Sequence, residues 1–128
     1  MGKLGREAVV VGAGMGGLLA ARVLSEHFDR VTVLERDATG DTGDPRPGVP
    51  QGKHLHVLLA GGQRVIGTLF PGFDEELDRL GAARLRVGPD LVVERPGFDP
   101  FPASDLGFHT AGVTRPALER IDMSKLEA

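Results

Sequence analysis

The chain has 128 residues, enough for one domain that buries a core, and it carries a net charge of −3 with 41% hydrophobic residues. This balance gives no indication of nucleic acid or a membrane surface as a partner, and the absence of cysteine excludes disulfide bonds and thiolate metal sites. The apolar runs are too short to cross a membrane and no leader segment is evident, so we expect a cytoplasmic location.

The N-terminal segment from Glu7 to Asp37 predicts a right-handed β-α-β unit. Residues 7–11 are almost all apolar, as in a parallel strand covered on both faces, and residues 14–27 have apolar side chains at helical spacing. We expect a turn at Asp29–Arg30 and a second apolar strand over residues 31–34. Two parallel strands joined by one helix form the first half of a Rossmann-type sheet, so the predicted fold class is α/β.

The turn after the first strand carries a G-x-G-x-x-G motif formed by Gly12, Gly14 and Gly17. In this motif the first glycine permits a tight turn, the second lets the backbone approach a pyrophosphate, and the third lets helix and strand pack closely. Glu35 follows the second strand, where a carboxylate accepts hydrogen bonds from a ribose diol of either FAD or NAD. The alternative is a structural glycine-rich turn, but the order of strand, glycines, helix, strand and acid favours dinucleotide binding.

A long loop is predicted for residues 36–53, which contain four glycines and three prolines and show no periodicity. Loops of this length in a compact domain are usually either functional or disordered. Arg46 and Lys53 in this loop could reach a phosphate or a substrate carboxylate, or they are solvated loop charges, and their spacing does not distinguish these interpretations.

Residues 54–70 predict an amphipathic helix, with apolar side chains recurring on one face. The Gly61–Gly62 pair weakens such a helix, which suggests that something packs close to its backbone. His54 and His56 would point in different directions from the helix start, so we do not expect a two-histidine metal site. Each histidine has either a capping or packing role or a role in a site.

The remainder predicts shorter elements. A helix is expected over residues 73–81 with Gly81 as its C-cap, followed by a hairpin of residues 83–87 and 91–95. The proline-rich and phenylalanine-rich stretch after it shows no regular period. Thr114 is a good N-cap, so another helix is expected to begin there.

Three phrases of the sequence resemble one protein family: GAGMGG with VTVLERD, RPGVPQGKHLHVLLAGG, and VTRPALE. Together they are similar to the N-terminal part of flavin-dependent monooxygenases of the aromatic-hydroxylase class, nearest the bacterial branch of squalene-epoxidase-like and polyether epoxidases. The resemblance covers residues 8 to about 120, and the PGVPQG-x-H-x-H phrase is far more specific than the glycine motif.

The resemblance implies FAD as cofactor, NAD(P)H as co-substrate and a hydrophobic or aromatic substrate for the parent family. Arg46 and the run from Gln51 to His54 would lie near the isoalloxazine edge, and Arg115 would reach back to the cofactor from its helix. No side chain is expected to be catalytic or to bind a metal, because the flavin carries the chemistry. The full set of cofactor-binding candidates is Gly12, Ala13, Gly14, Met15, Gly16, Gly17, Glu35, Arg36, Arg46, Gln51, His54 and Arg115.

The chain departs from this family in extent, since its members are about three times longer, as expected when a nucleotide-binding domain is joined to a substrate domain. We therefore expect residues 1–120 to be a partial FAD-binding domain with a small additional helical and hairpin portion, and residues 121–128 to be an atypical tail. Such a fragment would be inactive alone and would self-associate or be completed by another chain. The alternatives are an NAD-binding Rossmann module and a non-catalytic remnant that pairs with another protein.

Overall fold

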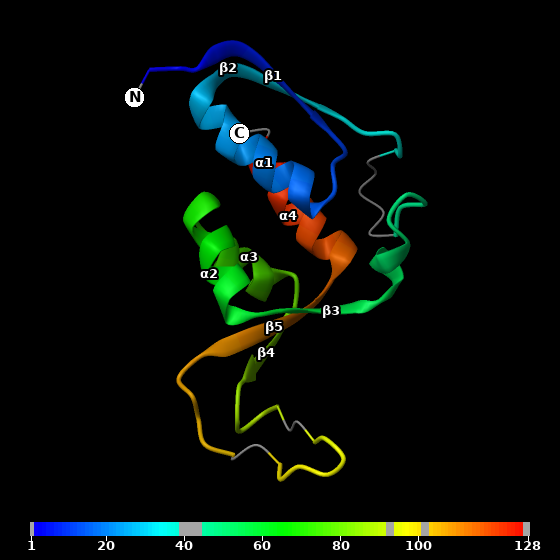
Figure 1. The fold of residues 1–128 in the computed structure, drawn as a ribbon, viewed down its shortest axis with the longest axis vertical. Coiled ribbons are helices and arrows are strands. Elements are labelled where there is room, and N and C mark those ends of the chain that lie inside the picture. The colour runs from blue at the N-terminus through cyan, green and yellow to red at the C-terminus, as the bar shows by residue number, and fades with distance from the viewer. Residues whose placement is uncertain (1, 39–44, 92–93, 101–102, 127–128) are drawn as a thin grey trace.

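The computed structural model describes residues 2–38, 45–91, 94–100 and 103–126, with the helical backbone alone for residues 122–126. In Figure 1 the helices lie between the two sheets, with β1 and β2 above them and β3, β4 and β5 below them. Within the described ranges, no helix combines the length and apolar character that a membrane crossing requires. The elements in chain order are β1 (Gly5–Val11), α1 (Met15–His27), β2 (Phe28–Leu34), η1 (Pro50–Lys53), β3 (Leu55–Leu58), α2 (Ala60–Leu69), α3 (Phe73–Arg79), β4 (Ala83–Arg86), β5 (His109–Thr114) and α4 (Arg115–Leu126).

The first sheet is the predicted β-α-β unit. Strands β1 and β2 pair in parallel, in a register that runs from Gly5 opposite Phe28 to Val11 opposite Leu34. Helix α1 connects them and packs against both strands. The α/β Rossmann-type fold class is therefore confirmed.

The connection from α1 to β2 differs from the prediction. We expected a turn at Asp29–Arg30, but both residues belong to β2, which begins directly after the helix. Phe28 already has extended backbone angles, with φ −124° and ψ 152°. Lys3 stabilises this abrupt exit because its Nζ donates to the carbonyl oxygens of Ser25 and Phe28 at 2.9 Å each.

Only one face of this sheet is covered within the described residues. Val10 is 8% exposed, whereas its neighbours Val9 and Val11 are 60% and 83% exposed. Because successive strand residues point to opposite faces, α1 covers the face that carries Val10. The expectation that β1 is covered on both faces is therefore wrong for the described part of the chain.

The predicted helix over residues 54–70 is also only partly correct. Its first residues form β3, and α2 begins at Ala60. Strand β3 forms because β5 offers it a partner, with Leu55 opposite Thr114 and Leu58 opposite Ala111. A side chain at Gly61 would meet nothing within 4 Å, and one at Gly62 would lie 3.4 Å from Leu58, so close packing on the backbone of this glycine pair is limited to Gly62.

Strand β5 was not predicted, and its presence changes the hairpin. The three-stranded sheet has the order β3-β5-β4, so β4 pairs with β5 in place of residues 91–95. Only an isolated bridge joins Val87 to Leu91, and residues 92–93 lie outside the described residues. The side chain of Asp90 accepts hydrogen bonds from the backbone N–H and the guanidinium of Arg86 at 2.9 Å, which closes a turn at the end of β4.

The main core lies between α2, α3, β5 and α4. Phe70, Phe73 and Leu77 are at most 1% exposed, and Ile121 on α4 is 3% exposed. Helix α4 begins as predicted, with Thr114 Oγ1 accepting the Ala117 N–H at 3.4 Å, and it continues without a break past residue 121. The division into a domain of residues 1–120 and a tail of residues 121–128 stays a prediction.

Candidate functional site

Two of the three motif glycines are required by the fold of the turn between β1 and α1. Gly12 has φ +94°, a conformation that side chains rarely adopt, and its N–H donates to the Leu34 carbonyl at 2.7 Å. A Cβ on Gly17 would lie 1.9 Å from the Gly12 carbonyl oxygen. These two glycines therefore let the strand, the turn and α1 approach one another closely.

Gly14 is different, because the chain itself does not require a glycine there. Its φ of −78° and ψ of 175° are open to any residue, and a Cβ would make only ordinary contacts, 3.7 Å from Arg115 Nη2 and 3.9 Å from Glu119 Oε1. Gly14 is also the N-cap of α1, which has no side-chain cap and no acidic residue in its first turn. An anion beside Gly14 would therefore face the positive end of the helix dipole.

Glu35 follows β2 and is held beside this turn by four hydrogen bonds from residues that the structure describes. Its Oε2 accepts the Ala13 N–H at 2.7 Å, and its Oε1 accepts the N–H groups of Arg36 at 2.7 Å and Asp37 at 3.0 Å. The fourth donor is Arg46 Nη1, 2.8 Å from Oε2. The backbone N–H of Asp37 contributes most to lowering the pKa of Glu35 to about 2, followed by that of Ala13, so the carboxylate is ionised at neutral pH.

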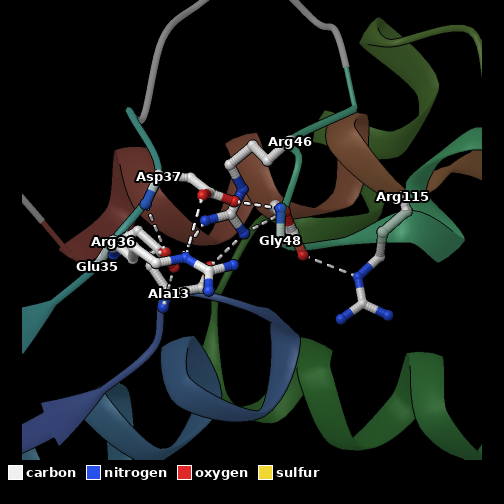
Figure 2. Close-up of polar contacts among 8 residues, drawn as sticks. Ala13, Glu35, Arg36, Asp37, Arg46, Gly48 and Arg115 are labelled. Atoms are coloured by element: carbon white, nitrogen blue, oxygen red, sulfur yellow. Dashed lines mark hydrogen bonds and ion pairs between the residues drawn. The ribbon is translucent and has the colours of Figure 1, made fainter.

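Arg46 connects three parts of the site. Besides Glu35, its guanidinium binds the Ala13 carbonyl oxygen at 2.9 Å and Glu119 Oε2 at 2.7 Å through Nη2. Figure 2 shows Arg46 between Glu35 on one side and Arg115 on the other. Although burial lowers the pKa of Arg46, its hydrogen bonds and ion pairs with Glu119 and Glu35 raise it above its ordinary value.

Glu119 on α4 is a site residue that the sequence analysis did not identify. Its side chain is 5% exposed, and it accepts hydrogen bonds from Arg46 and, at 2.9 Å, from Arg115 Nε. A buried carboxylate is normally paired, and this one is paired with two arginines. Its position four residues after Arg115 on a helix was the available signal.

A cleft of about 320 Å³ opens beside the glycine turn and the end of β2. Four of the predicted residues line it, namely Gly12, Gly14, Glu35 and Arg36. Its other lining residues, which the sequence analysis did not single out, are Val11, Leu34, Asp37, Gly48 and Val49.

One contact ties the loop after β2 to the edge of this cleft. Asp37 Oδ2 accepts the Gly48 N–H at 2.5 Å, and both residues line the cleft. The segment that carries Arg46 is therefore held against the end of β2. An acidic residue two positions after Glu35 was visible in the sequence, but its loop partner was not.

The other candidates lie around the cleft rather than in it. Gln51 and His54 are exposed, at η1 and directly after it, and neither lines the cleft. Met15 packs against the main core, and Gly16 is exposed on α1. Over the part of the chain that the structure describes, no group of three or more metal-binding side chains comes together.

Comparison with known proteins finds similarity over part of this chain. Residues 10–58 match the model of the NAD(P)-binding Rossmann-like domain. The parallel β-α-β unit within this segment agrees with a Rossmann-like fold. Protein Rv3254 of Mycobacterium tuberculosis is 44% identical over 85 residues, which make up 66% of this chain and 18% of that protein. The chain thus spans about a fifth of the length of this curated relative.

Proposed function

We propose that this chain is the FAD-binding portion of an FAD-dependent monooxygenase that uses NAD(P)H and O2 on a hydrophobic or aromatic substrate. The observation that carries the proposal is the ionised Glu35, fixed beside Gly12 and Gly14 at the cleft. The sequence phrase from Gly48 to His56 supports flavin over nicotinamide as the resident dinucleotide. Because the match covers 18% of the longer relative, the activity and substrate of a whole enzyme are part of this proposal.

The residues of the cleft fit the adenosine diphosphate half of such a cofactor. Glu35 would accept hydrogen bonds from the ribose diol, and the start of α1 would receive the pyrophosphate against Gly14. The absence of a side chain at Gly14 is then explained, because a Cβ there would occupy the space that the phosphates need. Arg115 Nη2 would lie 3.7 Å from that Cβ position, and Oε1 of Glu119, the ion-pair partner of Arg115, would lie 3.9 Å from it.

FAD would supply the oxygen chemistry, and this chain would supply binding and orientation. Glu35 and the glycine turn would hold the adenosine end, so the opposite end of the cofactor would be presented to parts of a larger enzyme. We assign no acid, base or nucleophile among the described side chains.

The second candidate is a module for NAD in place of FAD. The name of the matching family model favours it, and Glu35 suits the diol of either dinucleotide. A titration of the chain with FAD, NAD and FMN distinguishes the two candidates. We expect FAD to bind more tightly than FMN, since FMN lacks the adenosine ribose that Glu35 would bind. If FAD is the resident dinucleotide, it should also bind more tightly than NAD.

Glu35→Ala should weaken FAD binding by about 1–3 kcal/mol through the loss of charge-assisted hydrogen bonds, and should leave FMN binding unchanged. Glu75→Ala is the matched control, because it removes the same charge from an exposed position on α3. Tighter binding of NAD than of FAD would favour the second candidate. No binding of any dinucleotide, or equal loss of FAD and FMN in Glu35→Ala, would refute the assignment of Glu35.

A further inference from the structure

The hydrogen-bonding capacity of Glu35 is fully used by the protein. A carboxylate offers about four acceptor positions, two on each oxygen. Oε2 accepts from Ala13 N–H and Arg46 Nη1, and Oε1 accepts from the N–H groups of Arg36 and Asp37. A ribose diol that donates to this carboxylate must therefore replace at least one of these donors.

Of these donors, only Arg46 can leave without a change of the backbone. The other three are backbone N–H groups, fixed by the glycine turn and by the end of β2. Arg46 reaches Glu35 through Nη1 alone, and its Nη2 keeps two further acceptors, the Ala13 carbonyl and Glu119. Its guanidinium would thus remain neutralised and anchored after releasing Glu35.

We propose that Arg46 is a displaceable partner of Glu35 that competes with the ribose diol and thereby sets the affinity of the site for adenosine nucleotides. Glu119 is the anchor that retains Arg46 when the diol takes its place. This inference rests on the proposed function, in that the site takes an adenosine dinucleotide. It assigns to Arg46 a role at the ribose in place of the predicted contact near the isoalloxazine edge.

The test compares two probes that differ by one hydroxyl, ADP and 2′-deoxy-ADP, with the full chain. The ratio of their dissociation constants reports the contribution of the 2′-hydroxyl, while effects on the phosphates cancel. ADP is the part that FAD and NAD share, so the result does not depend on which dinucleotide is the cofactor. Isothermal titration calorimetry gives both constants.

Arg46→Met removes the competitor, so the diol no longer has to displace a charged donor. We expect the ratio, 2′-deoxy-ADP over ADP, to rise on the order of tenfold relative to the unmodified chain. Glu119→Gln weakens the alternative anchor of Arg46, so Arg46 should hold Glu35 more strongly and the ratio should fall toward one. The two variants therefore move the ratio in opposite directions, and Glu119→Gln provides the test if Arg46→Met does not fold.

Arg36→Met is the matched control, because the Arg36 side chain lies at the cleft and is 81% exposed but only its backbone N–H binds Glu35. It should change the affinity for both probes by the same factor. An unchanged ratio in folded Arg46→Met would overturn the proposal, because Arg46 and the diol would then share Glu35. A fall toward one in Arg46→Met would also overturn it and make Arg46 a positioning residue for Glu35. If the unmodified chain binds neither probe, the proposed function fails as well.

Discussion

Substitutions at two of the motif glycines should affect different properties, one the stability of the fold and the other the binding of the dinucleotide. Gly17→Ala forces a Cβ into the Gly12 carbonyl oxygen, 1.9 Å away, and should lower the free energy of unfolding by about 1–3 kcal/mol. Gly14→Ala meets only ordinary contacts and should lower the free energy of unfolding by less than about 1 kcal/mol. It should nevertheless abolish dinucleotide binding. Urea denaturation and FAD titration of both variants check this pair. Normal FAD affinity in Gly14→Ala would contradict the assignment of the phosphate position.

At acidic pH, the free energy of unfolding of the chain should depend on pH because of Glu35. Hydrogen bonds, first from the Asp37 N–H and then from the Ala13 N–H, lower its pKa from 4.5 to about 2 in the folded chain. The ionised form is thus favoured by folding, so its contribution is complete above pH 4.5 and is lost as the pH falls toward 2. The free energy of unfolding, measured by denaturant titration at several pH values, should fall more steeply over this range than in Glu35→Gln.

Asp90 titrates in the same range, because Arg86 lowers its pKa from 3.8 to about 2. The difference between the unmodified chain and Glu35→Gln isolates the contribution of Glu35, since Asp90 is common to both. Parallel curves for the two proteins would show that Glu35 is not held in its ionised form.

The part of the site that could be predicted from the sequence is the local part. Gly12, Gly14 and Glu35 follow from a motif with fixed spacing, and the structure places all three at one cleft. Arg46 was a candidate with an open role, because its partners come from distant segments, Glu35 before it and Glu119 far after it. No periodicity reveals that one loop arginine pairs with two carboxylates, one directly after β2 and one on α4.

At the scale of elements, two glycines at different positions relative to their helices should respond oppositely to alanine. Gly81 has φ +72° after α3, and the hydrogen bonds from Gly81 to Asp78 and from Ala82 to Leu77, both 3.0 Å, form a Schellman cap. Gly81→Ala should therefore lower the free energy of unfolding by about 1 kcal/mol. Gly67 lies within α2 with nothing within 4 Å of its Cβ position, so Gly67→Ala should raise the free energy of unfolding by about 0.5–1 kcal/mol. Thermal melts of both variants measure these changes, and stabilisation by Gly81→Ala would contradict the cap.

The elements that were predicted correctly have partners nearby in the sequence, whereas the elements that were missed have partners far away in it. Strand β1, helix α1 and strand β2 are contiguous, so their pattern appears within one short segment. Strand β3 was read as the start of α2 because its apolar residues continue the helical spacing, and only its pairing with β5 makes it a strand. The hairpin was wrong for the same reason, since β4 also takes its partner from β5.

At the scale of the whole molecule, the face of the first sheet that the described residues leave uncovered should cause self-association. Val9 and Val11 share this face with Leu34, the register partner of Val11, and these three side chains are 60%, 83% and 53% exposed. Burying such a face is favourable, so we expect light scattering to show concentration-dependent association. Replacing Val9 and Val11 by threonine should raise the dissociation constant by roughly tenfold.

Thr32→Val is the control, because Thr32 pairs with Val9 on the same face and the substitution enlarges the apolar surface. It should strengthen association. A chain that stays monomeric at all concentrations, with or without these substitutions, would contradict the role of this face.

The central claim, that the β-α-β unit with Glu35 and Gly14 binds FAD, is tested most directly by an absorbance spectrum. The purified chain is mixed with FAD and its spectrum is recorded before and after desalting, beside Gly14→Val treated in the same way. We predict that the unmodified chain retains visible flavin absorbance and that Gly14→Val loses it, because the valine side chain would occupy the pyrophosphate position. Loss of flavin by both folded proteins, or equal retention by both, would contradict the claim.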